Sequence, residues 1–359
     1  MDFALTEDQE AVRETVREIC ARFGDEYWRE GDAQGAYPDA FVAELTEGGW
    51  LSILIPEEYG GAGLGMTEAS IVLEEINRSG GNGTACHAQM YTMGTVLRHG
   101  SPEQKRRYLP EIAAGRLRLQ AFAVTEPTTG SDTTRLTTRA ERRGGGYVVN
   151  GQKTFISRVK QSDLMLLLAR TTPLEELQDL TQGLSVFLVD LREAGPAIDV
   201  RPLDVMLNHH TSELFIDNLE LPAESLIGEE GKGFRYILGG MNAERILIAA
   251  ECVGDAKWFI AKAHVAIEAA QLMRDKAAAL FDAGQPCGGE ANMAKMLASQ
   301  ASWHAANACM TTYGGYGFAR EYDVERKFRE AKLLEIAPVS NNMILAYVGQ
   351  RVLGMPRSY

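Results

Sequence analysis

The 359-residue sequence lacks any hydrophobic run long enough to cross a membrane, and a strongly apolar stretch such as LMLLLA at 164–169 has only the length of a buried strand. Its first residues lack the basic head and apolar core of a secretory signal peptide. The five cysteines are odd in number and scattered, without a Cys-x-x-Cys pair. We therefore expect reduced thiols in a cytoplasmic protein, and neither a disulfide framework nor a zinc site.

Positive charge is also scarce, with 36 Lys and Arg against 49 Asp and Glu and a net charge of −13. Such a balance disfavours nucleic acid and acidic membranes as partners, although it permits one small anionic ligand in a local basic pocket. The six histidines, which include His209 and His210, show no metal-ligand spacing with carboxylates. We therefore predict no metal site.

What the sequence does contain is a change of periodicity along its length. Residues 1–119 carry apolar side chains at helical spacing, residues 120–228 contain short β-branched and apolar runs, and residues 229–359 return to helical spacing. This order predicts an α+β fold with an N-terminal helical domain, a small middle β-domain that is barrel-like, and a C-terminal helical bundle.

Local signals predict where some elements begin and turn. Thr6 and Gln9 have the spacing of a capping box, and Thr67 and Asn242 are placed to cap later helices. In YVVNGQKTFIS (147–157), the Asn150-Gly151 pair is typical of a hairpin turn. A cap at Asn242 would put Glu244 in the first turn of its helix, where an acidic side chain suits the helix dipole without any chemical role.

Three stretches carry side chains suited to ligand binding. AFAVTEPTTGSD (121–132) ends a strand in hydroxyl groups that could hold a polar ring edge or an anion, but it is equally an ordinary exposed turn. FIS (155–157) places an aromatic ring and a hydroxyl on one strand face, for stacking on a ring or for plain sheet packing. TTYGGYGFAR (311–320) allows close backbone approach at its paired glycines.

Together, in order and spacing, these stretches resemble the acyl-CoA dehydrogenase family, FAD-dependent enzymes with a helical–β–helical subunit. The resemblance covers nearly the whole chain and rests on several motifs in register: RRYLPEIAAG, AFAVTEPTTGSD, YVVNGQKTFIS, LPAESLIGEEGKGF and GGYGFAREYDVERKFREAK. It implies an acyl-CoA substrate and FAD as cofactor. It also implies an electron-transfer flavoprotein as partner, assembly as a homotetramer or homodimer, and a place in fatty acid β-oxidation.

The resemblance also implies roles for single residues. Those that match cofactor-binding positions are Phe122, Val124, Thr125, Phe155, Ser157, Thr311, Gly314, Gly315, Ser340 and Asn342. Phe155 replaces a tryptophan beside the flavin ring, and Ser157 replaces a threonine near the reactive flavin nitrogen. Those that match substrate-binding positions are Ser131, Asn242 and Arg245.

The catalytic base is where the sequence departs from most of the family. Most members keep it in a Tyr-Glu-Gly-Thr motif before the last helix, whereas this chain reads EIAPVSNN (335–342) with Pro338 at the glutamate. Proline carries no side-chain base and no backbone N–H to polarise the thioester carbonyl. A branch that resembles isovaleryl-CoA and long-chain acyl-CoA dehydrogenases keeps its base in a motif that ends Glu-Arg. The matching NAER (242–245) makes Glu244 the predicted base.

A second departure concerns a block of residues. In the family a long helix continues past the equivalent of DAKWFI (255–260) into an Arg-x-x-Phe-Gly motif and returns in a second helix. Here Ile260 is followed directly by Ala261, and no Arg-x-x-Phe-Gly occurs. The absent block holds an arginine that contacts the FAD of the adjacent subunit, so its absence implies weaker FAD binding.

The sequence therefore predicts α,β-dehydrogenation of an acyl-CoA thioester to trans-2-enoyl-CoA, with Glu244 removing the α-proton in a dry pocket. Two alternatives remain open at this point. One is a flavin monooxygenase or acyl-CoA oxidase on the same fold. The other is a flavin-free protein that binds acyl-CoA or serves as a scaffold.

Overall fold

The computed structural model describes residues 4–259 and 264–357, and the chain divides into two compact units. The sheet unit comprises Ile55–Ala62 and Ala88–Gly240. The helical unit comprises the described parts of Met1–Leu54, Gly63–His87 and Met241–Tyr359. Two long helices, α5 (Thr84–His99) and α7 (Gly233–Phe259), contribute residues to both units.

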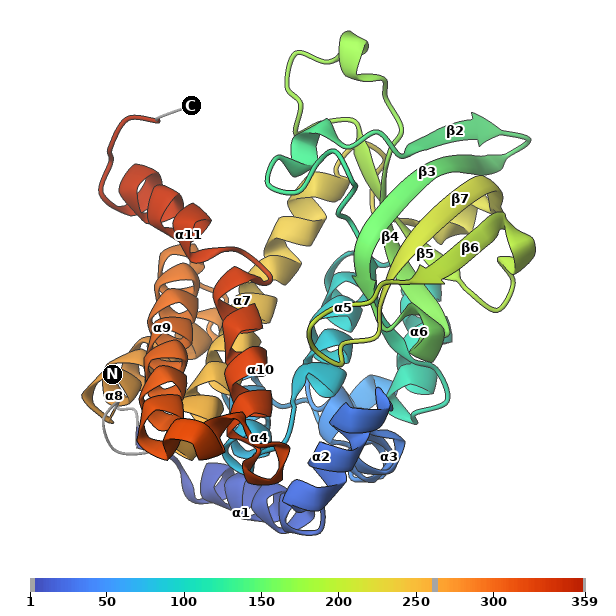
Figure 1. The fold of residues 1–359 in the computed structure, drawn as a ribbon. Helices are drawn as coiled ribbons and strands as arrows, with labels where there is room; N and C mark the ends of the chain where they lie inside the picture. Colours follow the sequence, from blue (N-terminus) through green and yellow to red (C-terminus); the bar gives the residue numbers. More distant parts are fainter. Residues whose placement is uncertain (1–3, 260–263, 358–359) are drawn as a thin grey trace. The chain divides into compact units, whose positions relative to one another are not determined.

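The sheet unit is built on one eight-stranded sheet in the order β6-β7-β3-β2-β4-β5-β8, with β1 pairing in parallel with β4. Figure 1 shows β6, β7, β3 and β2 as successive arrows. Every residue of β4 is buried, because LMLLLAR is apolar on both faces up to its last residue. The strands are β1 Leu119–Ala123, β2 Arg139–Arg143, β3 Gly146–Ser157, β4 Leu164–Arg170, β5 Leu184–Asp190, β6 Ile198–Pro202, β7 Thr211–Leu221 and β8 Leu226–Ile227.

The predicted turn at Asn150-Gly151 is wrong, because both residues lie inside β3. The hairpin instead turns at Gly144 and Gly145, whose positive φ angles of 58° and 87° suit a tight connection between β2 and β3. Within β3 the register shifts between Val149 and Gly151, so the Asn-Gly pair marks a bulge. The Asn150 side chain accepts a hydrogen bond from the backbone N–H of Asn218 at 2.8 Å.

The helical unit is a bundle in which α9 packs against α8, α10 and α11, and α4 packs against α1 and α8. The helices of the chain are α1 Glu7–Ala21, α2 Asp25–Gln34, α3 Asp39–Glu47, α4 Met66–Arg78, α5 Thr84–His99, α6 Pro102–Ala113, α7 Gly233–Phe259, α8 His264–Asp282, α9 Gly288–Tyr313, α10 Val324–Ile336 and α11 Asn341–Tyr347. Among the described residues, none of these helices is long and apolar enough to cross a membrane.

The observed starts of the helices can be compared with the caps predicted from the sequence. The capping box of Thr6 and Gln9 at the start of α1 is confirmed. The cap predicted at Thr67 is wrong, because α4 begins at Met66 after Gly65. The carboxylate of Asp282 accepts hydrogen bonds from the backbone N–H groups of Met66 (2.5 Å) and Thr67 (3.1 Å), so a distant residue satisfies the first turn.

The cap predicted at Asn242 is also wrong, because α7 begins at Gly233 and continues without interruption to Phe259. Glu244 therefore lies in the middle of a helix, where the favourable dipole of a first turn is absent. The Asn242 side chain accepts a hydrogen bond from Arg245 Nη1 at 2.9 Å and caps nothing.

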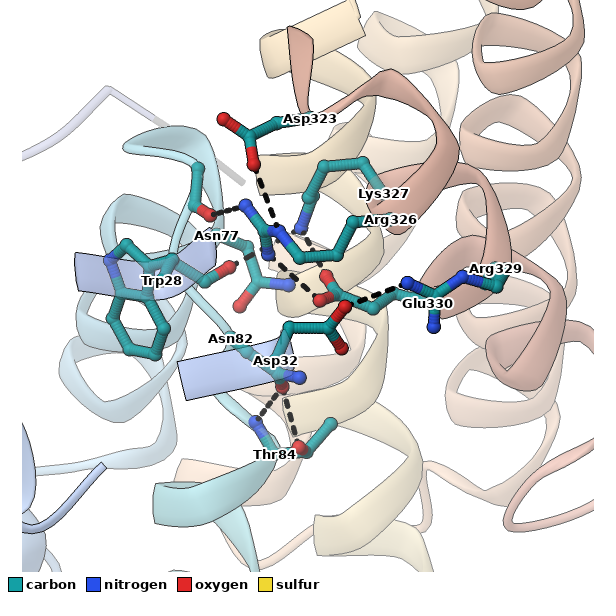
Figure 2. Close-up of polar contacts among 12 residues, drawn as sticks. Trp28, Asp32, Asn77, Asn82, Thr84, Asp323, Arg326, Lys327, Arg329 and Glu330 are labelled. Carbon is teal, nitrogen blue, oxygen red and sulfur yellow. Dashed lines mark hydrogen bonds and ion pairs between the residues drawn. The ribbon is translucent and has the colours of Figure 1, made fainter. Parts of the chain in front are cut away.

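A buried network of charges joins α10 to other parts of the helical unit (Figure 2). Arg326 Nη1 donates to Glu330 Oε1 at 2.8 Å, and its Nη2 donates to the carbonyl of Gly80 at 3.1 Å. Lys327 Nζ donates to Glu330 Oε2 at 3.0 Å and pairs with Asp255 of α7. Because each charge meets an opposite charge, the polar face of α10 is stable in the interior.

Candidate active site

In the sheet unit, three of the residues predicted to hold the flavin lie in β1 (Phe122) or directly after it (Val124 and Thr125). Phe122 is half-buried, with its ring 5.8 Å from that of Tyr91 in an edge-to-face arrangement. The carbonyl of Val124 accepts a hydrogen bond from Lys153 Nζ at 3.0 Å, and the carbonyl of Thr125 accepts one from the backbone N–H of Thr154 at 2.9 Å. The backbone of this segment is therefore held from one side by β3.

Glu126 anchors the same segment through a buried ion pair that the sequence analysis missed. Its Oε1 lies 2.9 Å from Lys153 Nζ, and the carboxylate also accepts hydrogen bonds from the backbone N–H groups of Thr137 (2.6 Å) and Thr138 (2.9 Å). Burial opposes ionisation, but the ammonium of Lys153 and the N–H groups outweigh it and lower the pKa of Glu126 to about 2. Burial lowers the pKa of Lys153 to about 8 against the attraction of Glu126. No clear signal for this pair stands in the sequence, because Lys153 lies between the polar residues Gln152 and Thr154.

Phe155 has an unusual conformation near the end of β3. Its φ is 58° and its side chain is 64% exposed, a costly combination for an aromatic residue. The regular alternation of β3 breaks between Lys153 and Ile156, and Ser157 beyond it is half-buried. An exposed aromatic face with hydroxyl groups nearby in the sequence fits the flat, polar-edged ring of a flavin.

Ser131, the predicted substrate-binding serine, is exposed in the turn after Glu126. In that turn the backbone groups of Glu126 and Thr129 hydrogen-bond to each other, at 3.3 and 3.1 Å. Thr129 Oγ1 is buried and has no hydrogen-bond partner among the described residues. A hydroxyl held without a partner beside an exposed serine suits a turn that binds a polar ligand.

In the helical unit, Glu244 is buried in α7 with 7% of its surface exposed. The neighbouring Arg245 is half-buried, and burial lowers the pKa of its guanidinium although the Glu244 carboxylate acts in the opposite direction. Arg245 Nε is buried without a hydrogen-bond partner among the described residues. A buried carboxylate next to an incompletely bonded guanidinium is an arrangement found at functional sites more often than in plain cores.

The terminal motif is held by a second buried lysine that the sequence analysis missed. Lys295 Nζ donates to the carbonyl of Val339 at 2.8 Å and to Asn341 Oδ1 at 3.0 Å. Burial lowers the pKa of Lys295 to about 8. Ser340, a predicted cofactor residue, uses its hydroxyl to cap α11, and Asn342 is exposed. At the position of the usual base stands Pro338, which offers no carboxylate.

The glycine-rich segment after α9 is exposed. Thr311 donates its hydroxyl hydrogen to the carbonyl of Asn307 at 2.9 Å, and Gly314 has a positive φ of 53°. At Gly315 the φ angle is ordinary, and a methyl group would meet no other atom within 4 Å. The described fold does not itself require glycine there, as expected if another molecule approaches the backbone.

The predicted site residues thus fall into two sets. Phe122, Val124, Thr125, Ser131, Phe155 and Ser157 belong to the sheet unit, and Asn242, Glu244, Arg245, Thr311, Gly314, Gly315, Ser340 and Asn342 belong to the helical unit. Within the described residues no group of three or more His, Cys, Asp or Glu is arranged to hold a metal ion. The junction of Ile260 and Ala261 lies outside the described residues.

The described residues thus place an exposed aromatic side chain, Phe155, in the sheet unit and a buried carboxylate, Glu244, in the helical unit. Three family models match the sequence: the N-terminal domain of acyl-CoA dehydrogenase at residues 6–116, the middle domain at 121–219 and the C-terminal domain at 256–353. The chain belongs to the acyl-CoA dehydrogenase family, which confirms the resemblance and the fold class predicted from the sequence.

Similarity to individual proteins supports this family assignment. The chain is 33% identical to the acyl-CoA dehydrogenase fadE12 of Mycobacterium bovis over 387 aligned positions that cover 99% of both proteins. A glutaryl-coenzyme A dehydrogenase in complex with glutaryl-CoA superposes with a TM-score of 0.92 at 30% identity, covering 100% of this chain and 98% of the other. A structure described as the electron transferring flavoprotein of Acidaminococcus fermentans has a TM-score of 0.91 at 28% identity, covering 98% of this chain and 100% of the other.

These relationships establish the general chemistry. The protein is an oxidoreductase that acts on CH–CH groups, and its cofactor is FAD, as in the rest of the family. The Phe155 ring and the hydroxyl groups near it suit that cofactor.

Proposed function

We propose that the protein oxidises an acyl-CoA thioester to trans-2-enoyl-CoA, with Glu244 as the base that removes the α-proton. The proposal rests on the residues that stand at the two positions where members of the family keep their base. Pro338 occupies one and has no carboxylate, whereas the other is Glu244, buried in α7. In a dry environment a carboxylate is a stronger base than in water, as abstraction of an α-proton requires.

The remaining roles follow the predicted sites. Phe122, Val124, Thr125, Phe155 and Ser157 hold the flavin ring, and Thr311, Gly314, Gly315, Ser340 and Asn342 contact the rest of the cofactor. Ser131, Asn242 and Arg245 bind the substrate. FAD supplies the acceptor for the hydride that leaves the β-carbon, which together with the α-proton accounts for both hydrogens removed.

Glu126 and Lys153 act as positioning residues for the flavin site. The Lys153 ammonium bonds to the carbonyl of Val124, and the Glu126 carboxylate holds the backbone of Thr137 and Thr138. These bonds fix the segment that follows β1 before any ligand binds. A preorganised donor and acceptor edge lowers the cost of ordering the site around the ring.

We further propose an electron-transfer flavoprotein as the acceptor of electrons, a homotetramer or homodimer as the assembly, and a role in β-oxidation in the cytoplasm. Family membership and the likeness to a structure described as an electron transferring flavoprotein support the acceptor. Exposed aromatic side chains around the glycine-rich segment support self-association, because large exposed apolar groups commonly mark interfaces.

The alignment with fadE12 supports the absence of a block of residues from this chain, which we propose lies between Ile260 and Ala261. It spans 387 positions, which exceeds the 359 residues of this chain, so the relative has residues with no counterpart here. With the arginine of that block missing, we expect FAD to bind less tightly than in relatives that retain it.

The first test is an anaerobic visible spectrum of the purified protein with FAD, before and after addition of a panel of acyl-CoAs. One of them should bleach the flavin band. Glu244→Gln should retain the yellow colour but bleach more slowly by about 10²–10⁴-fold, the usual contribution of a general base. Glu268→Gln, which changes an exposed carboxylate on α8, is the matched control and should behave as wild type.

Two outcomes would contradict the proposal. If Glu244→Gln bleaches at the wild-type rate, another group is the base. If no acyl-CoA bleaches the flavin of the wild-type protein, dehydrogenation is not its reaction. Reoxidation of the reduced flavin by air at a rate comparable to turnover would favour an acyl-CoA oxidase in place of an enzyme that uses an electron-transfer flavoprotein.

A further inference from the structure

Three buried acidic residues lie along one face of α7. Glu251 is seven residues after Glu244, and Asp255 is four residues after Glu251, spacings that return to the same side of a helix. Asp255 is compensated, since it pairs with Lys327 and accepts a hydrogen bond from Asn77 Nδ2 at 3.0 Å. Glu251 is compensated only in part, although its side chain is completely buried.

One oxygen of Glu251 is held firmly. His87, in the first turn of α5, lies with its Nδ1 2.7 Å from Glu251 Oε1. Gly83 lies so close that a methyl group there would come within 2.9 Å of Glu251 Oε1 and within 2.6 Å of Asn77 Oδ1. The start of α5 therefore fits closely around this oxygen.

The other oxygen of Glu251 is not held. Glu251 Oε2 is buried and has no hydrogen-bond partner among the described residues. A buried carboxylate oxygen without a donor is unfavourable, and such groups in native proteins commonly have a functional explanation. Because Oε1 is held in place, Oε2 has a defined position and can accept a hydrogen bond from a donor that is not part of the chain.

The position of Glu251 relative to Glu244 suggests what that donor is. Two helical turns separate them, about 10 Å along α7. The side of the helix between them is buried and apolar, with Leu247 and Ile248 nearly inaccessible to solvent. If Glu244 meets the α-carbon of the thioester, an acyl chain that follows this face of α7 brings its far end to Glu251.

We propose that Glu251, oriented by His87, binds a hydroxyl group on the distal part of the acyl chain. The substrate class would then be acyl-CoAs that carry a hydroxyl about two helical turns from the carbon that Glu244 deprotonates. This inference rests on the proposed function, because it takes the site of proton abstraction from Glu244. A purely structural role, in which the pair only joins α5 to α7, would give no preference among substrates.

The test compares acyl-CoAs of increasing length, each with either a terminal hydroxyl or a terminal methyl group. For the wild-type holoenzyme, the ratio of kcat/KM for the hydroxylated over the plain substrate should peak at one length. A site that must pair a buried polar group rejects the analogue without it, so we expect a preference between about tenfold and 10⁴-fold. Glu251→Leu should reverse the preference, and His87→Gln should weaken it.

Binding to Glu244→Gln separates this inference from the proposed function. Because that variant turns over slowly, the dissociation constants of the same substrate pairs can be measured by titration, and the hydroxylated member should bind more tightly at the same length. If both members of every pair bleach the flavin of the wild-type protein equally well, the proposed dehydrogenation is supported and the proposed role of Glu251 is refuted. If nothing bleaches but the binding preference persists and Glu251→Gln reduces it, the proposed function fails and the recognition role stands.

Melting temperatures of the variants test the alternative that Glu251 and His87 have a purely structural role. Should Glu251→Leu fold poorly, Glu251→Gln serves in its place, because it keeps the volume of the side chain, replaces one carboxylate oxygen by an amide nitrogen and should reduce the preference. A structural pair would lower the melting temperature of these variants and leave the ratio of kcat/KM unchanged, and that result would overturn the proposal.

Discussion

The pair of Glu126 and Lys153 ties the fold of the sheet unit to the segment that we propose holds the flavin. Both side chains are buried, and Lys153 also bonds to the carbonyl of Val124. Loss of either partner would leave the other charge in the interior, which typically costs about 3–5 kcal/mol. Substitution of either residue is therefore expected to change both the stability of the sheet unit and the geometry of the segment that follows β1.

This pair predicts an acid-dependent loss of stability. In the unfolded chain the carboxyl of Glu126 takes up a proton near its ordinary pKa of 4.5, but in the folded protein only near about 2. Between these values the unfolded state binds more protons, so stability present above about pH 4.5 is lost as the pH falls toward 2. The loss should be on the order of 2 kcal/mol after allowance for screening.

The measurement is the free energy of unfolding in urea between pH 3 and 6 for wild type and Glu126→Gln. At neutral pH the variant should be less stable, and the difference from wild type should shrink as the pH falls. The control is Glu111→Gln, whose exposed pairing with Arg116 should make little difference. A difference between wild type and Glu126→Gln that stays constant with pH would show that the carboxyl has the same pKa in the folded and the unfolded chain, so that the pairing with Lys153 does not lower it.

At the scale of elements, the bulge in β3 depends on a glycine. Gly151 has a φ of 156°, and a methyl group at this position would lie 2.5 Å from Thr138 Oγ1 and 2.7 Å from its Cα. Gly151→Ala should therefore push β3 away from the chain that precedes β2. We expect a loss of about 1–3 kcal/mol, the usual cost of an extra methyl in a tightly packed place.

The change in the midpoint of urea unfolding measures this loss. Gly31→Ala in α2 is the matched control, because nothing lies within 4 Å of its added methyl group. It should stabilise the protein by about 0.5–1 kcal/mol, since alanine favours the helix interior. Equal effects of the two substitutions would show that the bulge tolerates a side chain.

The helices and strands themselves could be predicted from periodicity, but several of their ends could not. LMLLLA is apolar throughout and forms β4, and the capping box of Thr6 forms at α1. At Thr67 and Asn242 the cap signals failed, because Asp282 supplies a carboxylate from far along the chain and the long apolar run of α7 continues through Asn242. Local sequence signals indicate where a helix can begin, but tertiary packing determines where it does begin.

For the site, the sequence could indicate residues that lie within a motif but not contacts between motifs. Phe122 and Phe155 were predicted as site residues because short motifs carry them. The contact of His87 with Glu251 joins residues 164 positions apart, and neither lies in a motif that suggests it. Such pairs arise when segments distant in sequence come into contact, which the pattern of a single helix does not specify.

At the scale of the whole molecule, charged side chains within the helical unit connect segments distant in sequence. Arg329 Nη2 donates to Asp32 Oδ2 at 2.7 Å, across 297 positions of the chain. Figure 2 shows this pair next to the cluster around Arg326 and Glu330. Arg29 pairs with Asp323 in the same region at 2.7 Å. Because both ends of the chain contribute to one charge network, we expect the helical unit to unfold as a single cooperative body.

The outer surface of that unit carries four exposed aromatic residues around the glycine-rich segment, which we name the aromatic patch. Phe318 is 76% exposed and Tyr316 65%, with Tyr313 and Tyr322 partly exposed beside them. Tyr316 and Tyr322 are in ring contact, with centroids 5.3 Å apart. An apolar group of this kind, next to residues proposed to contact FAD, is expected to be covered by a second copy of the chain.

Phe318→Asp should therefore weaken both self-association and FAD retention. A buried charge at an interface lacks a partner, so the dissociation constant of the assembly should rise on the order of tenfold or more. Sedimentation velocity recorded in the flavin band measures assembly and bound FAD together. Val265→Asp, at an 84% exposed position on α8, is the control for added surface charge and should leave both unchanged. If Phe318→Asp sediments as wild type with its FAD intact, the aromatic patch faces solvent, and assembly must use another surface.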